Sequence, residues 1–362
     1  MSPAEVAQPA FRAAWEALAS DASDPNPFFE PWFALPSLAH FGDAGKVQIA
    51  AHFDGDRLTG LLPLARRSDY YGYPILHAAA WLHDNAFCGL PLISRGFERS
   101  FWRALLAQLD ERPGGALFLH LPQMPSDSRT AHALEAVGKE TGRQVVCVEQ
   151  AERAMLASEL SPQDYYTQSM TPKRRKELRR LQKRLAEEGT LTFERCNGSK
   201  DIERWIAQFL ALEAAGWKGE AGSALANAAA TRGLFTEAMS GAAQAGRLEC
   251  LALHIDGNPI AMLASFVTPP GVFSFKTAFD ERFARYSPGL LLQIENLDLL
   301  ARDDIAWADS CAVEGHSMIE RIWREKRPIS SLNIAIGGPV RRTAFRALMA
   351  YETRGRTSKK EL

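Results

Sequence analysis

The apolar positions in the second half of the chain form short runs and helical repeats that predict an ordered series of elements. Six apolar runs predict strands, at about 191–195, 248–255, 259–267, 272–279, 305–309 and 331–336. Helical spacing predicts helices after Asp201, at about 224–244 and at about 288–302. Ser317 and Glu320 have the spacing of a capping box and predict one more helix. The order β-α-α-β-β-β-α-β-α-β is typical of an α/β (mixed α+β) fold.

A short pattern recurs and predicts two copies of one domain. The motif His-apolar-Asp-Gly begins at His52 and again at His254, which is 202 residues later. In both places an apolar strand meets an Asp-Gly turn and a second apolar strand leaves it, as in a hairpin. We therefore expect an N-terminal helical extension (1–26), two lobes (27–150 and 151–340), and a C-terminal helix with a polar tail (341–362).

Composition and charge exclude several classes of protein. The chain is 46% hydrophobic and 23% charged, which excludes a wholly disordered or fibrous protein. With 42 basic and 43 acidic residues, the formal charge is −1, which argues against a globally basic nucleic-acid binder. No secretory signal or spanning apolar stretch is present, and the five scattered cysteines form no metal motif. We expect a cytoplasmic protein without a metal.

The junction that leads into residue 288 has the features of an anion site. Ser287 suits an N-cap, Pro288 suits the first helical position, and Gly289 lets a ligand approach the backbone. The first N–H groups of such a helix attract anions, and Arg282 and Arg285 stand just before them. The same residues also fit an ordinary capped helix with solvated arginines.

Four segments in the second half resemble the GNAT superfamily of acyl-CoA-dependent transferases. They are closest to the CelD-type acetyltransferase branch, which is related to the Fem-type aminoacyl transferases. The segments are Gly216-Trp217-Lys218-Gly219, Phe275-Lys276-Thr277-Ala278-Phe279-Asp280, Arg285-Tyr286-Ser287-Pro288-Gly289 and Asp309-Ser310-Cys311-Ala312. The resemblance covers about residues 170–325 and implies two GNAT-like lobes, each with a twisted, mostly antiparallel sheet flanked by helices.

The resemblance also implies where acyl-CoA would bind. The residues expected to hold the cofactor are Lys276, Arg282, Arg285, Tyr286, Ser287, Gly289 and Leu290. The family's phosphate loop has a second small residue where this chain has Leu291. Lys276 lies in an apolar strand, so its charge needs a CoA phosphate, a substrate carboxylate, or a salt bridge to Asp309 or Asp280. The first lobe lacks a comparable basic loop, and we interpret it as degenerate.

Acyl transfer to an amine requires a group that removes a proton. Three side chains are candidates for this general base. They are Asp309 at a strand end, His316 seven residues later, and Glu213 on the helix that precedes Gly216-Trp217-Lys218-Gly219. The tetrahedral oxyanion needs a donor, commonly a backbone N–H of the strand beside the phosphate helix. Each of the three side chains also has an ordinary structural interpretation.

A strongly basic helix is predicted at 173–184. It carries Lys173, Arg174, Arg175, Lys176, Arg179, Arg180, Lys183 and Arg184, with only Glu177 opposing. A thin stripe of Leu178, Leu181 and Leu185 would pack inward. The helix is either a solvated bridge between lobes or a surface for an anionic membrane, CoA phosphates or a charged polymer.

These features together predict an N-acyltransferase that moves an acyl group from acetyl-CoA or a longer acyl-CoA to a primary amine. The acceptor would be an amino sugar of an envelope polysaccharide or a long-chain sphingoid amine, as in a bacterial ceramide-synthase-like protein. Residues expected to contact it are Trp217, Lys218, His83, Asp84 and Asn85. There are two alternatives. One is aminoacyl transfer from tRNA, which is the one role expected for nucleic acid, and the other is a degenerate scaffold that assists polysaccharide synthesis. The basic helix would place the enzyme at the inner face of the membrane.

Overall fold

The computed structural model describes residues 1–42, 46–196, 198 and 200–354. The chain forms two compact units. Unit 1 contains Met1–Glu152 and Pro328–Leu362, and unit 2 contains Arg153–Arg327. Unit 2 is thus one continuous stretch, whereas unit 1 is made of two separate ones. In the described part of the chain, no helix is long and apolar enough to cross a membrane.

Unit 1 has a mixed sheet with the strand order β1-β2-β3-β5-β12-β6, and β4 pairs with β2. Its strands are β1 (Val47–Asp54), β2 (Arg57–Arg67), β3 (His77–Ala80), β4 (Leu92–Ile93), β5 (Phe118–Pro125), β6 (Val145–Leu156) and β12 (Glu325–Ala335). Its helices are α1 (Pro3–Val6), α2 (Pro9–Ser20), η1 (Pro27–Phe29), α3 (Pro31–Phe41), α4 (Glu98–Glu111), α5 (Arg129–Glu140) and α12 (Pro339–Thr353). The polar tail at 355–362 lies outside the described residues.

Unit 2 has the strand order β6-β11-β10-β9-β8-β7. Its own strands are β7 (Leu191–Cys196), β8 (Leu248–Ile255), β9 (Asn258–Thr268), β10 (Gly271–Phe279) and β11 (Trp307–Asp309). Its α-helices are α6 (Pro162–Ser169), α7 (Pro172–Leu185), α8 (Ile202–Ala214), α9 (Trp217–Glu220), α10 (Ala229–Gln244) and α11 (Pro288–Glu295). Its 3₁₀-helices are η2 (Leu225–Asn227), η3 (Glu281–Tyr286), η4 (Asn296–Ala301) and η5 (Ile319–Arg321).

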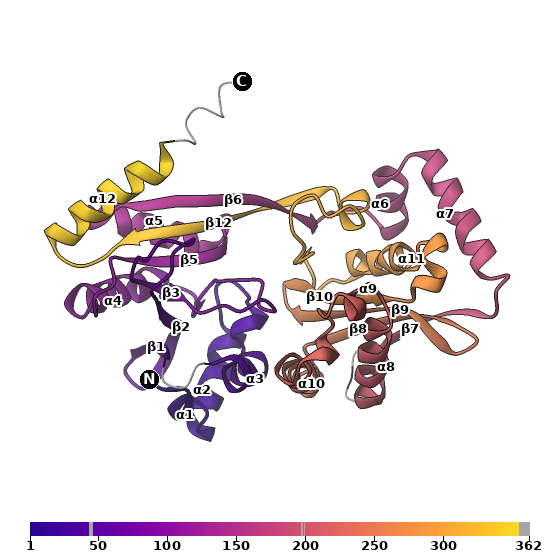
Figure 1. The fold of residues 1–362 in the computed structure, drawn as a ribbon, viewed down its shortest axis with the longest axis horizontal. Coiled ribbons are helices and arrows are strands. Elements are labelled where there is room, and N and C mark those ends of the chain that lie inside the picture. Colours follow the sequence, from indigo (N-terminus) through magenta and orange to yellow (C-terminus); the bar gives the residue numbers. More distant parts are fainter. Residues whose placement is uncertain (43–45, 197, 199, 355–362) are drawn as a thin grey trace. The chain divides into compact units, whose positions relative to one another are not determined.

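Helices cover both faces of the sheet in unit 2 (Figure 1). On one face, Phe209 of α8 and Phe235 of α10 stack in a column with Phe275 of β10 and Phe266 of β9. On the other face, leucines of α11 pack on leucines of β8 and β9. Every residue of β8 is therefore buried, which is why this strand is apolar along most of its length.

The strands of the two units repeat one pairing pattern. In unit 1 the β1–β2 hairpin is antiparallel, and β3 runs parallel to β5. In unit 2 the β8–β9 hairpin is antiparallel, and β10 runs parallel to β11. The hairpins contain His52 and His254, and each has a register shift beside that histidine. The predicted fold class, α/β with two similar lobes of mostly antiparallel sheet, is confirmed.

Most of the predicted elements of unit 2 are present, with shifted ends. The hairpin strands and the strand at 191–195 are observed almost as predicted, and the helix at 288–302 is an α-helix that continues as a 3₁₀-helix. The helix predicted from Ser317 is wrong. The segment forms only the short η5, without a side-chain cap, and β12 begins at Glu325.

The two units also differ from the predicted domain ranges. The N-terminal helices belong to unit 1, where Trp15 is fully buried and its indole N–H donates to Phe29 O at 2.9 Å. The segment 328–340, predicted in the second lobe, belongs to unit 1 because β12 pairs there with β5. Hydrophobic patterning predicts where a strand lies, but it does not indicate which strand pairs with it.

Candidate active site

Two parallel strands of unit 2 separate to form a fork. The pairing of β10 with β11 covers only Gly271–Phe273 against Trp307–Asp309, whereas β10 continues to Phe279. A bulge between Ser274 and Lys276 disturbs the register of β10 with β9 just beyond this point. Bulges re-aim side chains and are common beside active sites. A crevice past the last pair of two parallel strands is also a usual place for ligands in α/β sheets.

Ser274 lies at this fork and was not identified from the sequence. The residue is 8% exposed, and its hydroxyl oxygen has no hydrogen-bond partner among the described residues. A buried polar atom without a partner is rare and often marks a ligand site. The available signal was a single hydroxyl between Phe273 and Phe275 in an apolar strand.

The loop after β10 carries the predicted phosphate residues. Arg282 bonds Asp280 through both Nε and a terminal nitrogen, at 3.0 Å and 2.6 Å. Arg285 donates to Glu188 Oε1 at 2.7 Å, and the Tyr286 hydroxyl bonds the same oxygen. These hydrogen bonds, first that of Tyr286, lower the pKa of Glu188. The side chains of Arg282 and Arg285 are 84% and 68% exposed, so both can exchange a carboxylate for another anion.

Ser287 occupies the N-cap position of α11 as predicted, but without the side-chain hydrogen bond expected of a capping serine. Ser287 adopts φ 55° and ψ 52°, a left-handed conformation, and its side chain makes no capping hydrogen bond. A capping serine normally has extended dihedral angles, which aim its hydroxyl at the first turn. Pro288 does occupy the first turn as predicted, and the Ser287 carbonyl accepts from Leu290 N and Leu291 N at 3.0 Å and 3.1 Å.

Gly289 and Leu290 are buried at the start of α11. A Cβ at Gly289 would lie 3.1 Å from Met318 Sδ, so the loop after β11 packs closely against this helix. Leu290 is 4% exposed and belongs to the core with Val272 and Trp323. Close packing is thus one reason for a glycine here, and contact with CoA stays a prediction for both residues.

Lys276 stands at the bulge of β10. Its ammonium nitrogen lies 5.4 Å from the centroid of the neighbouring Phe275 ring, close enough for a cation–π contact. The carboxylates of Asp309 and Asp280, considered as partners from the sequence, bond arginines. A role for Lys276 toward CoA stays a prediction.

Glu213 and Lys218 fix the segment after α8 onto the end of β10. Glu213 accepts from Lys218 Nζ at 2.7 Å and from Leu225 N at 2.8 Å, and its side chain is 3% exposed. Lys218 Nζ also donates to the Thr277 carbonyl of β10 at 3.5 Å. Trp217 is 56% exposed, and its N–H donates to Glu281 Oε1 at 2.6 Å. The structure therefore brings Trp217 and Lys218 next to the strand and the loop predicted to bind acyl-CoA.

Asp309, the leading candidate for the base, is held between two arginines. Its carboxylate lies 3.4 Å from Arg153 and 3.5 Å from Arg327, and it accepts from Cys311 N at 2.8 Å. The carboxylate side chain is 1% exposed. Arg327 in turn lies over the Trp307 ring, 4.3 Å from its centroid. This arrangement favours a structural role, and the role of Asp309 as a base stays a prediction.

His316 lies in the loop that follows β11 and is exposed. Its N–H donates to the Val313 carbonyl at 3.3 Å, and its carbonyl accepts from Glu320 N at 3.2 Å. The loop also contains Met318, which contacts the start of α11. Of the three proposed bases, His316 is the one whose side chain a substrate can reach without breaking an ion pair.

The three residues of the first lobe predicted to hold the acceptor lie within unit 1. The His83 ring stacks on Phe41 and Phe33, with ring centroids 4.7 Å and 6.1 Å apart. Asn85 is buried and its N–H donates to His83 Nδ1 at 3.3 Å, whereas Asp84 is exposed. These contacts account for a turn, and binding of an acceptor stays a prediction.

The basic segment forms the helix α7, as predicted. Leu178 and Leu185 are buried and Leu181 packs against the core. Arg174 pairs with Glu177 at 2.8 Å, and Arg175 donates to the carbonyls of Thr167 and Met170. Six basic residues are exposed along the helix, namely Lys173, Lys176, Arg179, Arg180, Lys183 and Arg184.

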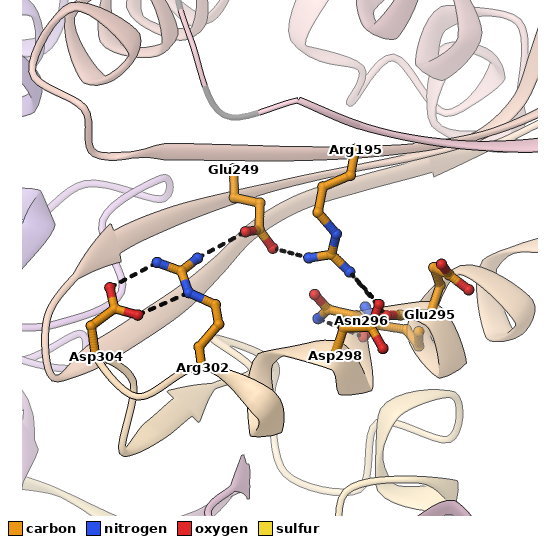
Figure 2. A network of polar contacts seen from close by, with 8 residues as sticks. Arg195, Glu249, Glu295, Asn296, Asp298, Arg302 and Asp304 are labelled. Carbon is orange, nitrogen blue, oxygen red and sulfur yellow. Dashed lines mark hydrogen bonds and ion pairs between the residues drawn. The ribbon is translucent and has the colours of Figure 1, made fainter. Parts of the chain in front are cut away.

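A second polar network in unit 2 has no counterpart in the sequence analysis (Figure 2). Glu249 of β8, whose side chain is 4% exposed, bonds Arg195 at 2.6 Å and Arg302 at 2.9 Å. Arg302 also pairs with Asp304, and Arg195 donates to the Glu295 carbonyl. The network joins β7, β8 and the end of η4. Arg195, Glu249 and Arg302 are far apart in sequence, and the fold brings them together.

Residues 172–316 match the family described as acetyltransferase (GNAT) domain. The match begins in α7 and ends in the loop after β11, so it contains the fork and the basic loop. It confirms the expectation of a GNAT-type acyltransferase domain, whereas the CelD-type branch within that superfamily stays a prediction. Among curated proteins, none matches the chain.

Three solved structures share the fold over nearly the whole chain. The crystal structure of FemX is 8% identical, covers 93% of this chain and 98% of its own, and has a TM-score of 0.58. The C-terminal domain of a protein described as a lysylphosphatidylglycerol synthetase from Agrobacterium fabrum is 11% identical, with coverages of 96% and 97% and a TM-score of 0.55. L-PGS from Bacillus licheniformis is 13% identical, with coverages of 94% and 97% and a TM-score of 0.54. At these identities the likeness concerns the fold.

Proposed function

We propose that the protein is an acyl-CoA-dependent N-acyltransferase whose unit 2 binds acyl-CoA at the fork between β10 and β11. The observation that carries the proposal is the match of residues 172–316 to a GNAT acetyltransferase domain. The geometry of the fork supports a specific location, because a bulge and a buried hydroxyl that bonds no described residue lie where the two strands separate.

The pyrophosphate of CoA would bind beside the loop of Arg282 and Arg285. Both guanidinium groups are exposed and already bond single carboxylates, so a phosphate can replace those partners with charge-assisted hydrogen bonds. The backbone N–H groups at the start of α11 add a favourable dipole, as at other helix N-termini that bind anions. Lys276 supplies a further positive charge on β10, which leads from the fork to the loop.

The proposed reaction forms one bond and breaks one. The amine nitrogen attacks the thioester carbonyl carbon, the C–S bond breaks, and CoA leaves as its thiol. The carbonyl oxygen becomes an oxyanion on the way and needs donors. Ser274 and the backbone N–H groups of β10 beyond Phe273 are donors at the fork.

The amine must lose a proton, and we place His316 first among the three candidates for the base. The carboxylates of Glu213 and Asp309 are 3% and 1% exposed, and each already bonds a cation. Reaching either one would expose a buried charge, which is costly. His316 is exposed in a loop that contacts the start of α11. If it is the base, His316→Ala loses turnover that added imidazole restores, whereas a structural histidine gives no such rescue.

The acceptor class we favour is an envelope-related amine, either an amino sugar or a long-chain sphingoid amine. The exposed cations of α7 support an acceptor at an anionic membrane surface. A second candidate function is aminoacyl transfer from tRNA. It is favoured by the likeness in fold to FemX and to L-PGS over more than 90% of the chain.

The test measures release of the CoA thiol from acetyl-CoA and palmitoyl-CoA with glucosamine or sphinganine as acceptor. We expect one donor–acceptor pair to turn over. We also expect Arg285→Ala to weaken binding of that acyl-CoA about five- to tenfold, since it removes one charge-assisted contact. Arg204→Ala, an exposed arginine of α8, is the matched control and should bind normally.

The alternatives give different results in the same experiment. Transfer that requires charged tRNA and disappears with nuclease would replace the acyl-CoA proposal by the aminoacyl route. Binding of neither CoA ester, by a folded protein, would leave only a scaffold role.

A further inference from the structure

Unit 1 contains a pocket of about 480 Å³ beside the C-terminal half of α12. Four tyrosines, two glutamates and two aliphatic residues line it. They are Tyr70, Tyr71, Tyr73, Tyr351, Glu149, Glu352, Ile75 and Leu348. The volume is in the usual range for small-molecule sites. The lining includes two carboxylates and no basic side chain.

The aromatic rings come from two places and are held by the fold. Three of the tyrosines lie in the turn between β2 and β3, where Tyr70 and Tyr73 exchange backbone hydrogen bonds at 2.9 Å and 3.0 Å. Tyr71 between them has φ 50°, a left-handed conformation that turns the chain sharply. The rings of Tyr70 and Tyr71 lie edge to face, with centroids 4.7 Å apart.

Three of these rings are unusually exposed. Tyr71 and Tyr73 are each 59% exposed and Tyr351 is 68% exposed, which makes them three of the most exposed large apolar side chains in the described residues. Tyr70 is buried and packs in a core with Phe118 and Phe345. Exposed aromatic side chains gathered around one pocket are typical of a binding site.

The two carboxylates are oriented by neutral donors. The Tyr70 hydroxyl donates to Glu352 at 3.0 Å and accepts from Asn333 Nδ2 at 2.6 Å. Glu149 Oε2 accepts from the Ser331 hydroxyl at 3.0 Å and the Tyr71 hydroxyl at 3.4 Å. Burial first, and then the Glu149 charge, raise the pKa of Tyr71, so its phenol stays a donor. Within the described residues, neither glutamate forms an ion pair.

We propose that this pocket binds an organic cation, an ammonium group that carries an apolar body. Aromatic faces attract cations, and they do so best for ammonium groups that are weakly hydrated. Glu149 and Glu352 would neutralise the charge, while the rings and the aliphatic lining would cover the carbon atoms. An anion would meet two carboxylates, and a neutral apolar molecule would bury them without a partner. The proposal concerns unit 1 alone and does not depend on acyl transfer by unit 2.

The test compares choline with 3,3-dimethylbutan-1-ol, which has the same shape without the charge. Calorimetric titration of the whole chain should show that choline binds. The neutral alcohol should bind at least about tenfold more weakly, because the cation–π and carboxylate contacts require the charge. Octyltrimethylammonium should bind more tightly than choline, since its chain adds apolar contact. Equal affinity for choline and the alcohol, or no binding of either ammonium compound, would overturn the proposal.

Variants identify the pocket as the place of binding. Glu149→Gln and Glu352→Gln should each weaken choline binding about fivefold or more, and Tyr351→Leu should do the same, whereas Tyr351→Phe keeps a ring and should bind nearly as well. Glu111→Gln, an exposed glutamate of α4, is the control. Thermal unfolding of each variant separates loss of the site from loss of the fold. Wild-type affinity in both glutamate variants, with the fold intact, would assign binding elsewhere and end the proposal.

Discussion

Two buried polar side chains at the fork of unit 2 differ in their contacts. Asp309 has ionic partners, whereas the Ser274 hydroxyl has no hydrogen-bond partner among the described residues. The partners of Asp309 are arginines at 3.4 Å and 3.5 Å, and they account for a carboxylate at a strand end. No described residue bonds the Ser274 hydroxyl, which lies where β10 leaves β11. The sequence analysis considered a salt bridge from Lys276 to Asp309, but it did not point to the two arginines. The arginines lie 156 and 18 residues from Asp309, and only the pairing of β6, β11 and β12 brings them there.

Ser274→Ala tests whether this hydroxyl serves a ligand. The change removes a buried polar atom that bonds none of the described residues, so the free energy of unfolding should stay the same or increase by up to about 1 kcal/mol. Acyl transfer should nevertheless fall, by about tenfold or more if the hydroxyl stabilises the oxyanion. Urea unfolding and steady-state kinetics measure the two effects. A variant that is both as active and as stable as the wild type would make Ser274 a passive part of the strand.

Asp309→Asn distinguishes a structural carboxylate from a catalytic one. The change leaves Arg153 and Arg327 without their negative partner, and removing one member of a buried ion pair costs about 3–5 kcal/mol. We expect a clearly lower unfolding temperature together with turnover that is retained at temperatures where the variant is folded. Asp304→Asn is the control, because that carboxylate is 52% exposed. A stable variant whose turnover drops by about a hundredfold would instead identify Asp309 as the base.

At the scale of elements, the apolar pattern located helices with one buried face and strands that are buried on both faces. The helices α7, α8 and α10 are of the first kind and the β8–β9 hairpin is of the second, and their predicted ranges are close to the observed ones. The helix predicted from Ser317 had a capping signal but no apolar stripe after it, and it shortened to a single 3₁₀ turn. Capping chemistry can therefore start a helix only where packing continues it.

The helix α7 gives a prediction of its own, since it packs along a narrow stripe and carries six exposed cations. Replacing Lys176, Arg179, Arg180 and Lys183 with Gln should leave thermal unfolding nearly unchanged, because exposed charges contribute little to stability. Binding to phosphatidylglycerol vesicles should fall at least about tenfold at low salt, since each cation near an anionic surface contributes about 1 kcal/mol. Vesicle cosedimentation measures this. The charge-conserving variant with Arg179→Lys and Arg180→Lys is the control. If the Gln variant still sediments like the wild type, the helix is a solvated structural element.

At the scale of the whole molecule, the chain leaves unit 1 after Glu152 and returns to it at Pro328. The two ends of unit 2 are close together, because Arg153 and Arg327 bond the same carboxylate. The sequence repeat indicated two related lobes, and the pairing patterns bear this out. The repeat could not show that the C-terminal strand completes the first lobe, since strand pairing between distant segments leaves no local signal.

This connectivity predicts how fragments of the chain behave. The cores of unit 2 consist of residues between Ala154 and Trp323, so a fragment of residues 153–327 should unfold cooperatively on its own. A fragment of residues 1–152 should not, because it lacks β12, which lies between β5 and β6. Joining 1–152 to 328–354 through a short Gly/Ser linker should restore a folded unit 1. Circular dichroism during thermal unfolding checks all three, and a cooperative transition in fragment 1–152 would contradict the expectation.

The position of β12 also sets an order of events during synthesis on the ribosome. Residues 1–156 emerge first, yet their sheet lacks an inner strand until residue 335 has been made. At about 5–20 residues per second, the gap lasts roughly 10–35 s, during which β5 and β6 present unpaired edges. Unit 2 can meanwhile form from an uninterrupted segment. Unit 2, whose synthesis begins later, is therefore the first to mature, and the nascent first unit is the part of the chain that most needs a chaperone.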